Sequence, residues 1–319
     1  MLEFERDLDE LRDHIAELER DPSADANSQV ARELAVLQLE LEARTADIFA
    51  HLTPWQRVQL ARHPQRPHTQ DYIDRLCSDF TELHGDRRFA DDPSVIAGLA
   101  TFEGRSVIVV GHQKGRGTTE NVERNFGMAH PEGFRKALRL FDMAERFQRP
   151  VLTFLDTPGA SPTLDDEKRG QSWAIAENMA RLARLRVPLI VTVIGEGGSG
   201  GALALGVGDR VLMLEHAIYS VASPEAAAAI IWRDSDHAEE AAAALRLTAP
   251  DLLRAGLIDR VVPEPDGGAH RDFDTAAANL HAQLAPMLQE LSGQNIDDLV
   301  NARYAKFRAM GEHQIVPAG

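Results

Sequence analysis

Short apolar runs rich in β-branched residues alternate with helical stretches along most of this chain. The runs cover residues 106–110, 151–155, 189–194, 210–214 and 218–221, and Pro150 and Pro188 stand directly before two of them. Helix-forming stretches lie between most of the runs, chiefly at 133–147 and 171–185, and two more follow at 272–291 and 296–310. Strands that alternate with helices are typical of an α/β fold with buried, mostly parallel strands. We therefore predict an α/β architecture.

The first 52 residues follow a different pattern, which predicts a helical hairpin. Apolar residues spaced 4-3-4-3 mark one helix face at Phe4, Leu8, Leu11, Ile15 and Leu18. The segment DPSADANS, residues 21–28, interrupts this spacing, which restarts at Val30, Leu34, Leu37 and Leu41. We expect an antiparallel hairpin over residues 3–51 that packs on its own body or on another subunit. The chain is accordingly divided into domains at 1–52 and 53–319.

Composition and charge exclude several classes of function. The 319 residues include 50 acidic and 34 basic side chains, and a formal charge of -16 would repel nucleic acid. The single cysteine, Cys77, excludes an internal disulfide and a multi-cysteine zinc site, and we expect it to be buried in an amphipathic helix. No apolar run approaches the ~20 residues of a membrane helix, and the acidic N-terminus lacks the apolar core of a signal peptide. We expect a soluble cytoplasmic protein that binds neither membranes nor nucleic acid.

The glycine-rich stretch VTVIGEGGSGGALALG, residues 191–206, matches two catalytic or binding motifs by spacing. They are the dinucleotide fingerprint, at Gly195, Gly197 and Gly200, and the nucleophile elbow, at Gly197, Ser199 and Gly201. The first motif fits poorly because only about two helical turns follow before the next strand, whereas a parallel crossover needs more. The elbow needs a downstream histidine and acid, for which the candidates are His216, His237 and His270 with Asp209, Asp234 and Asp259. A chain with 12 histidines offers such sets by chance.

A third interpretation of this stretch uses the backbone rather than side chains. Close packing of strand and helix would require one or two of the glycines and leaves the others unexplained. Two backbone N–H groups at the start of a helix can stabilise an oxyanion, and glycines let a substrate approach them. A second turn, FLDTPGASP, also follows a buried strand and carries Pro158 and Gly159. Two such turns at successive strand ends predict a shared cleft lined by backbone donors.

A dozen motifs in order resemble one enzyme family from about residue 53 to residue 310. They include ARHPQRP, GHQKGR, RNFGM, PEGFRKALRL, DTPGA, RGQS, VIGEGGSGGALALGVGD, YSVASPE and VVPEPDGGAHR. This series resembles the carboxyltransferase alpha subunits of bacterial acetyl-coenzyme A carboxylase. The resemblance implies a crotonase-like spiral of ββα units behind the N-terminal hairpin. It also implies transfer of a carboxyl group from carboxybiotin, on its carrier protein, to acetyl-coenzyme A, which gives malonyl-coenzyme A.

The resemblance also implies partners and site residues. The partner would be a beta subunit that carries a four-cysteine zinc ribbon, in an alpha2-beta2 assembly, and this chain would bind no metal and no covalent cofactor. The N–H groups of Gly200 and Gly201 would stabilise the charge on the ureido oxygen of biotin, which makes them the expected catalytic pair. Ser199 would then be a small turn residue. We expect further substrate contacts at Gly197, Gly198, Ser199, Pro158, Gly159 and Ala160. Lys114 and Arg116 either contact coenzyme A phosphates or belong to an ordinary solvated surface loop.

Other features are expected to be structural. Arg135, Lys136 and Arg139 should lie on a solvated helix face. Ser223, Pro224 and Glu225 are typical of the N-cap and first two residues of a helix.

Several residues near the expected cleft depart from the family pattern. Ser161-Pro162-Thr163 replaces tyrosine-proline-glycine, Ala226-Ala227 replaces glycine-cysteine, and Gly117 replaces a glutamate. Loss of a tyrosine would widen the pocket or change its polarity. Two alternatives to the acetyl-coenzyme A reaction therefore stay open. One is a diverged paralogue that accepts another acyl group or decarboxylates it, and the other is a non-catalytic scaffold, against which the retained glycines argue.

Overall fold

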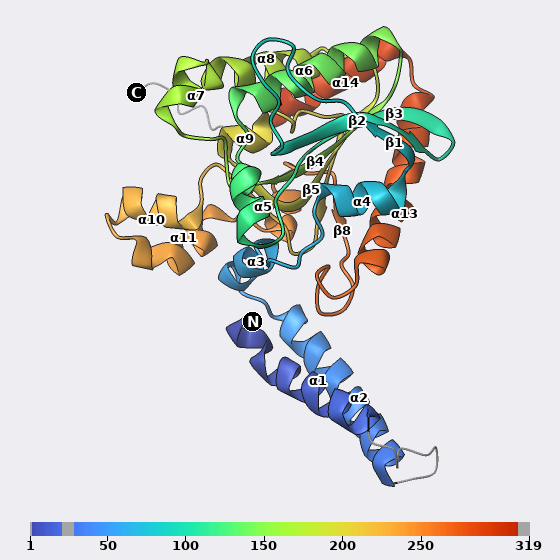
Figure 1. The fold of residues 1–319 in the computed structure, drawn as a ribbon, viewed down its shortest axis with the longest axis vertical. Helices are drawn as coiled ribbons and strands as arrows, with labels where there is room; N and C mark the ends of the chain where they lie inside the picture. The colour runs from blue at the N-terminus through green and yellow to red at the C-terminus, as the bar shows by residue number, and fades with distance from the viewer. Residues whose placement is uncertain (1, 21–28, 312–319) are drawn as a thin grey trace, which may run out of the picture.

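One central sheet organises the body of the protein in a computed structural model that describes residues 2–20 and 29–311 (Figure 1). Within this part of the chain the sheet has eight strands in the order β1-β2-β3-β4-β5-β6-β8, and β7 pairs with β5. β1 to β3 are antiparallel, and β3, β4, β5, β6 and β8 are parallel. The strands are β1 (Ser78–Glu82), β2 (Val95–Phe102), β3 (Arg105–His112), β4 (Val151–Thr157), β5 (Leu189–Gly198), β6 (Arg210–Leu214), β7 (Ile218–Ser220) and β8 (Arg260–Val262).

The α/β prediction is confirmed, and the five predicted strands correspond to β3 to β7. Every residue of β4 is buried, as is every residue of β5 except the last, because helices cover the sheet. The sequence pattern missed three strands. β1 alternates weakly, β8 has three residues, and β2 contains the small residues of VIAGLATF, so none has a long β-branched run.

Helices pack on the sheet from both sides (Figure 1). α6 (Pro131–Arg146) lies against α8 (Gln171–Ala183) and against β2 and β3, and α14 (Ile296–Ala309) contacts α8. α4 (Thr69–Leu76) pairs with α13 (Phe273–Ser292). The four predicted helices of this region are confirmed as α6, α8, α13 and α14. Cys77 is half-buried and caps the end of α4 instead of lying within the helix as expected.

The predicted solvated face of α6 is wrong at Lys136 and also at Arg135, whose side chain is only 13% exposed and is paired with Glu132. The Lys136 side chain is fully buried, and its Nζ lies 2.7 Å from Asp91 Oδ1 and 2.7 Å from the carbonyl oxygen of Asp92. Asp91 and Asp92 precede β2 and contact α6 through Lys136. A buried ammonium is stable when it is paired and hydrogen-bonded, and helical spacing alone does not reveal such partners.

The N-terminal hairpin projects from the body (Figure 1). It consists of η1 (Glu3–Glu5), α1 (Arg6–Glu19) and α2 (Gln29–Ala50), and the predicted break at residues 21–28 lies outside the described residues. Leu8 and Ile15 are buried on the predicted seam. Leu8 also joins Phe49, Leu52 and Leu60 in an apolar cluster that connects the hairpin to α3 (Pro54–Ala61). The pairing of the two helices is confirmed, and a separate domain at residues 1–52 stays a prediction.

Shorter helices complete the body. α10 (Pro224–Ile231) and α11 (Ala238–Leu245) pack on each other at one side (Figure 1). Ser223 caps α10 as predicted, because its side chain accepts a hydrogen bond from the N–H of Ala226. The remaining short elements are α5 (Gly117–Glu123), η2 (Asn125–Gly127), α7 (Leu164–Lys168), α9 (Ser199–Leu203), η3 (Ser235–His237) and α12 (Ala249–Arg254).

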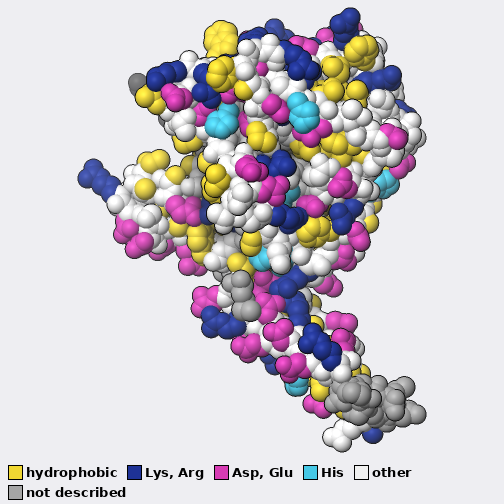
Figure 2. Space-filling model, viewed as in Figure 1, with side chains coloured by type: hydrophobic (Ala, Val, Ile, Leu, Met, Phe, Trp, Pro, Cys, Tyr) yellow, Lys and Arg dark blue, Asp and Glu magenta, His cyan; other side chains and the backbone are white. Residues whose placement is uncertain are grey.

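Acidic and basic side chains are interspersed over the face shown in Figure 2, with many acidic groups along the hairpin. None of the helices in the described ranges combines the length and the apolar character that a membrane crossing requires.

Candidate active site

The two glycine-bearing turns lie side by side at the end of the sheet. DTPGA begins with the last two residues of β4, and GEGGSGG runs from the last four residues of β5 into α9. These parallel strands pair as far as Thr157 with Gly197. The carboxyl ends of parallel strands share one edge of the sheet, which is where α/β proteins place their sites. The structure therefore brings together Pro158, Gly159 and Ala160 with the 197–201 segment, as the sequence predicted.

Most of the glycines in the GEGGSGG turn allow close packing. This corrects the expectation that packing explains only one or two of them. A Cβ on Gly198 would overlap the carbonyl of Pro158, and one on Gly201 would lie 2.6 Å from the amide nitrogen of Ala160. A Cβ on Gly197 would lie 2.7 Å from the ring of Tyr219, and one on Gly195 would overlap the carboxylate of Asp156. Gly195, Gly198 and Gly201 therefore let this turn touch the DTPGA segment, and Gly197 lets β5 pack on Tyr219 of β7.

Gly200 differs from the other glycines because its surroundings are open. The nearest heavy atoms to a Cβ at this position belong to Ile175, at 3.7 and 3.8 Å. Gly200 and Gly201 are the second and third residues of α9, so their N–H groups precede the first hydrogen bond within the helix. Gly200 also borders an apolar groove of about 320 Å³, lined in addition by Ser199, Leu203, Gly206, Val211, Tyr219, Ser220, Val221, Leu252, Leu257, Phe307 and Met310.

The geometry does not support either motif that the spacing of this stretch matched. α9 has only five residues, which is too short for the crossover of a dinucleotide-binding unit. The three candidate histidines contact other residues: His216 contacts Arg57, His237 contacts Glu240, and His270 contacts Glu5. Ser199 is exposed and adopts a left-handed backbone conformation with φ of 51°. No hydrogen bond between Ser199 and a histidine occurs among the described residues, so an activated nucleophile is not supported.

A chain of ion pairs lies beneath the two turns. Lys114 Nζ lies 2.8 Å from Asp156 Oδ1 and 2.7 Å from Glu196 Oε2. Arg62 then connects Glu196, at 2.7 Å, to Glu225, at 2.5 Å. Burial would lower the pKa of Lys114, but the two carboxylates outweigh burial and raise that pKa above its ordinary value. Burial likewise acts to raise the pKa of Asp156, and the Lys114 ammonium outweighs it and lowers that pKa.

The two basic residues expected to meet coenzyme A phosphates have different surroundings. The ammonium of Lys114 is already bound by two carboxylates. Arg116 is 43% exposed at its side chain, lies 2.6 Å from Asp71 and stands over the ring of Phe273. The Arg116 side chain is therefore exposed, in a surface ion pair, whereas the Lys114 side chain is mostly buried between two carboxylates.

Three residues of this ion-pair chain were missed from the sequence: Arg62, Asp156 and Glu196. Each stands inside a motif that was noticed for its glycines or prolines, namely ARHPQRP, DTPGA and GEGGSGG. A charged residue next to a buried strand is itself a signal, because such a group needs a partner.

Known proteins resemble this chain over almost its full length. The model of the family described as acetyl co-enzyme A carboxylase carboxyltransferase-like matches residues 1–311. The acetyl-coenzyme A carboxylase carboxyl transferase subunit alpha of Sorangium cellulosum is 55% identical over 311 residues, which is 98% of each chain. A protein of the same name from Thermus thermophilus is 53% identical over 310 residues, which is 97% of this chain and 98% of that one.

This chain belongs to the family of acetyl-coenzyme A carboxylase carboxyltransferase alpha subunits. Among solved structures, transcarboxylase 12S with methylmalonyl-coenzyme A superimposes with a TM-score of 0.60 at 20% identity. The match covers 72% of this chain and 42% of that one, and it establishes the fold. The crotonase-like fold predicted from the motifs is thus confirmed.

The loop that departs from the alpha-subunit pattern is fixed by a buried aspartate. Ser161, which is buried, donates a hydrogen bond to Asp166 Oδ2 at 2.5 Å, and Thr163 donates to the same oxygen at 2.5 Å. His130 lies 2.8 Å from Asp166 Oδ1. Thr163 also caps α7. The two departures thus supply hydroxyl groups that anchor this loop, and Ser161 points into that network.

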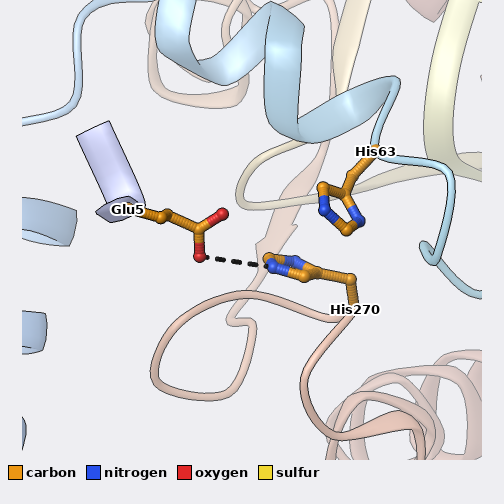
Figure 3. A group of neighbouring side chains, drawn as sticks. All are labelled: Glu5, His63 and His270. Carbon is orange, nitrogen blue, oxygen red and sulfur yellow. Dashed lines mark ion pairs between the residues drawn. The ribbon is translucent and has the colours of Figure 1, made fainter. Parts of the chain in front are cut away.

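A second cluster of ionisable groups joins the hairpin to the body (Figure 3). Glu5 of η1 lies 3.4 Å from His270 Nε2 and 3.1 Å from Arg271, and the rings of His63 and His270 are 4.1 Å apart. Two imidazoles and a carboxylate resemble a zinc ligand set. However, the Glu5 carboxylate is already paired with Arg271. His63 Nδ1 accepts a hydrogen bond from the N–H of Gln65, so the proton of neutral His63 lies on Nε2 and neither ring nitrogen is free to bind a metal. The contacts are those of an ion-pair clasp.

Proposed function

We propose that this alpha subunit works with a beta subunit to transfer the carboxyl group of carboxybiotin to acetyl-coenzyme A. The product would be malonyl-coenzyme A, from which fatty acid synthesis proceeds. The biotin would be delivered on a carrier protein, the partner would bring a zinc ribbon, and the assembly would be an alpha2-beta2 heterotetramer. High identity to named alpha subunits over 98% of the chain supports this reaction.

One observation within the site supports it most directly: Gly200 has room at its Cβ position and lines the apolar groove. When bound, carboxybiotin would supply the carboxyl group, and its loss would leave negative charge on the ureido oxygen of biotin. The N–H groups of Gly200 and Gly201 would donate to that oxygen. One such preorganised donor contributes about 2.7–4 kcal/mol of transition-state stabilisation.

The surroundings of Gly200 suit an uncharged ring system. The groove beside it is apolar, with Leu203, Tyr219 and Phe307 among its lining residues. The charged groups of the site lie beneath the turns and are bound to one another. In this proposal Pro158, Gly159 and Ala160 shape the wall next to Gly201, and Ser199 takes no part in covalent chemistry.

The experiment is an assay of the reconstituted pair. The chain is purified alone and with a beta subunit, and malonyl-coenzyme A with free biotin is followed for release of acetyl-coenzyme A. We expect turnover by the pair and none by the isolated chain. Full activity of the isolated chain, or none from an assembled pair, would contradict the proposal. Parallel assays with other acyl-coenzyme A thioesters test whether the loop at Ser161 and Thr163 changes the substrate.

A further inference from the structure

Lys114 connects the two glycine turns through their acidic residues. Its Nζ contacts Asp156, the next-to-last residue of β4, and Glu196, which lies in the last three residues of β5. The N–H of Glu196 also donates to Asp156 Oδ1 at 3.0 Å. One ammonium thus bridges two strand ends, and the chain leads from these ends directly into the DTPGA and GEGGSGG turns.

The backbone of η2 covers one side of the lysine stem, and Lys114 also lines a pocket of about 300 Å³ with its two carboxylates. A Cβ on Gly127 would lie 2.9 Å from Lys114 Cγ and 2.9 Å from the carbonyl oxygen of Asp156, so η2 packs directly on the lysine stem. Asn125, Phe126 and Gly127 all have positive φ, of 44°, 53° and 76°. The side chain of Lys114 is only 15% exposed. The charge is therefore held inward, toward the carboxylates.

We propose that Lys114 is a positioning residue that holds the DTPGA and GEGGSGG turns together for carboxyl transfer, and that it does not bind coenzyme A phosphates. The inference rests on the proposed function of the Gly200–Gly201 pair. Without the ammonium, two buried carboxylates would face each other and repel, and the turns that they begin would separate. A displacement of about 1 Å at a reacting centre can lower a rate by about a hundredfold.

The electrostatic surroundings agree with this role. The titratable groups that face the lysine and its two carboxylates come from several elements: Arg62 and Arg66 near α3, His68 and Tyr72 at α4, and His112 at the end of β3. Burial lowers the pKa of His112 to about 4, so it is neutral and does not replace the ammonium. Arg62 is divided between Glu196 and Glu225, which leaves Lys114 as the cation that contacts both Asp156 and Glu196 among the residues described.

The test compares Lys114→Met with Lys168→Met in the reconstituted complex. Lys168 lies on exposed α7, where it pairs only with Asp165 within the described structure, so it is a matched control. We expect Lys114→Met to lower kcat by about ten- to a hundredfold and to leave KM for malonyl-coenzyme A within about twofold. The loss should shrink as the pH is lowered, because the unpaired carboxylates then share a proton.

A double variant and a second measurement complete the test. Lys114→Met/Glu196→Gln should recover much of kcat, since a neutral amide removes the repulsion. Amide hydrogen exchange at residues 157–160 and 197–203 should be about tenfold faster in Lys114→Met than in Lys168→Met. A raised KM with unchanged kcat would overturn the proposal in favour of phosphate binding, and unchanged exchange would overturn the link between the turns. An inactive wild-type complex in which Lys114→Met still accelerates exchange would refute the proposed function alone.

Discussion

Gly201 lies so close to Ala160 that a Cβ on the glycine would be 2.6 Å from the alanine amide nitrogen. Gly200, its neighbour in the chain, has nothing nearer than 3.7 Å in the direction of a Cβ. The two consecutive glycines therefore have different structural roles. Gly201 lets the two turns touch, and Gly200 lines the groove with room at its Cβ position.

This difference predicts opposite effects on stability. Gly201→Ala should lower the free energy of unfolding by about 1–3 kcal/mol, because the methyl group meets backbone that cannot yield without moving the other turn. Gly200→Ala should leave that free energy unchanged or raise it by up to about 1 kcal/mol, since alanine favours the helix. Urea denaturation of both variants measures this. Equal destabilisation by the two substitutions would refute the distinction.

Ser199 is a strained position, with φ of 51° in a residue that has a Cβ. Ser199→Gly should raise the free energy of unfolding by about 1 kcal/mol, because glycine adopts positive φ without steric cost. The variant should also retain turnover in the reconstituted complex, whereas replacement of a nucleophile would abolish it. Urea denaturation and a turnover assay together decide the point, and a dead but folded variant would restore the nucleophile hypothesis.

The hydroxyl of Ser161 should stabilise the loop ahead of α7. Ser161→Ala removes a hydrogen bond to the buried Asp166 carboxylate, so we expect a loss of about 1.5–3 kcal/mol in unfolding free energy. Ser78→Ala is the matched control, because Ser78 donates to Asp79 on an exposed strand. It should change stability by less than about 0.5 kcal/mol. Similar effects of the two variants would show that the loop is not anchored as described.

The clasp between hairpin and body should weaken in acid. Burial lowers the pKa of His63 to about 4, below the ordinary value of 6.5. Between these two values the unfolded chain binds a proton that the folded chain does not, so stability falls as the pH is lowered from about 6.5 to about 4. Burial acts to raise the pKa of Glu5, but His270 and Arg271 outweigh it and lower that pKa, so its contribution is lost only at still lower pH.

His63→Gln tests this pH dependence. The variant should flatten the dependence of unfolding free energy on pH by up to about 1.4 kcal/mol per pH unit in that range. Urea denaturation at several pH values between 4 and 7 provides the measurement, with His281→Gln as the control, because His281 is an exposed histidine paired with Glu103. A slope that is the same in His63→Gln and wild type would exclude His63 as the titrating group.

The spacing of apolar residues and the positions of proline and glycine predicted most of the helices and strands that position the site. The run at 189–194 is mostly β-branched and the run at 151–155 is mostly apolar because β4 and β5 are covered by helices on both sides, so the sequence indicates their burial directly. β1 was not predicted because it is a short edge strand with mostly exposed residues, and β2 was not predicted because small residues such as Ala97 and Gly98 interrupt its apolar run.

The chemistry of the site was only partly predictable. The glycine turns and their adjacency follow from local sequence, since successive parallel strands end at the same edge. The ion pairs of Lys114 and Lys136 do not, because their partners lie 82 and 45 residues away along the chain and are brought near only by the fold. For the same reason, sequence spacing did not separate the glycines that pack against Pro158 and Ala160 from the one that stays open.

The central claim is that the N–H groups of Gly200 and Gly201 stabilise the negative charge on the ureido oxygen of biotin. Gly200→Val in the reconstituted complex tests this claim most directly. Its control is Gly293→Val at the C-cap of α13, where a Cβ also has room. We expect both variants to assemble with the beta subunit and to melt near the wild-type temperature. Turnover of malonyl-coenzyme A with biotin should fall by at least about a hundredfold in Gly200→Val alone. Near-normal turnover by an assembled Gly200→Val complex would contradict the account.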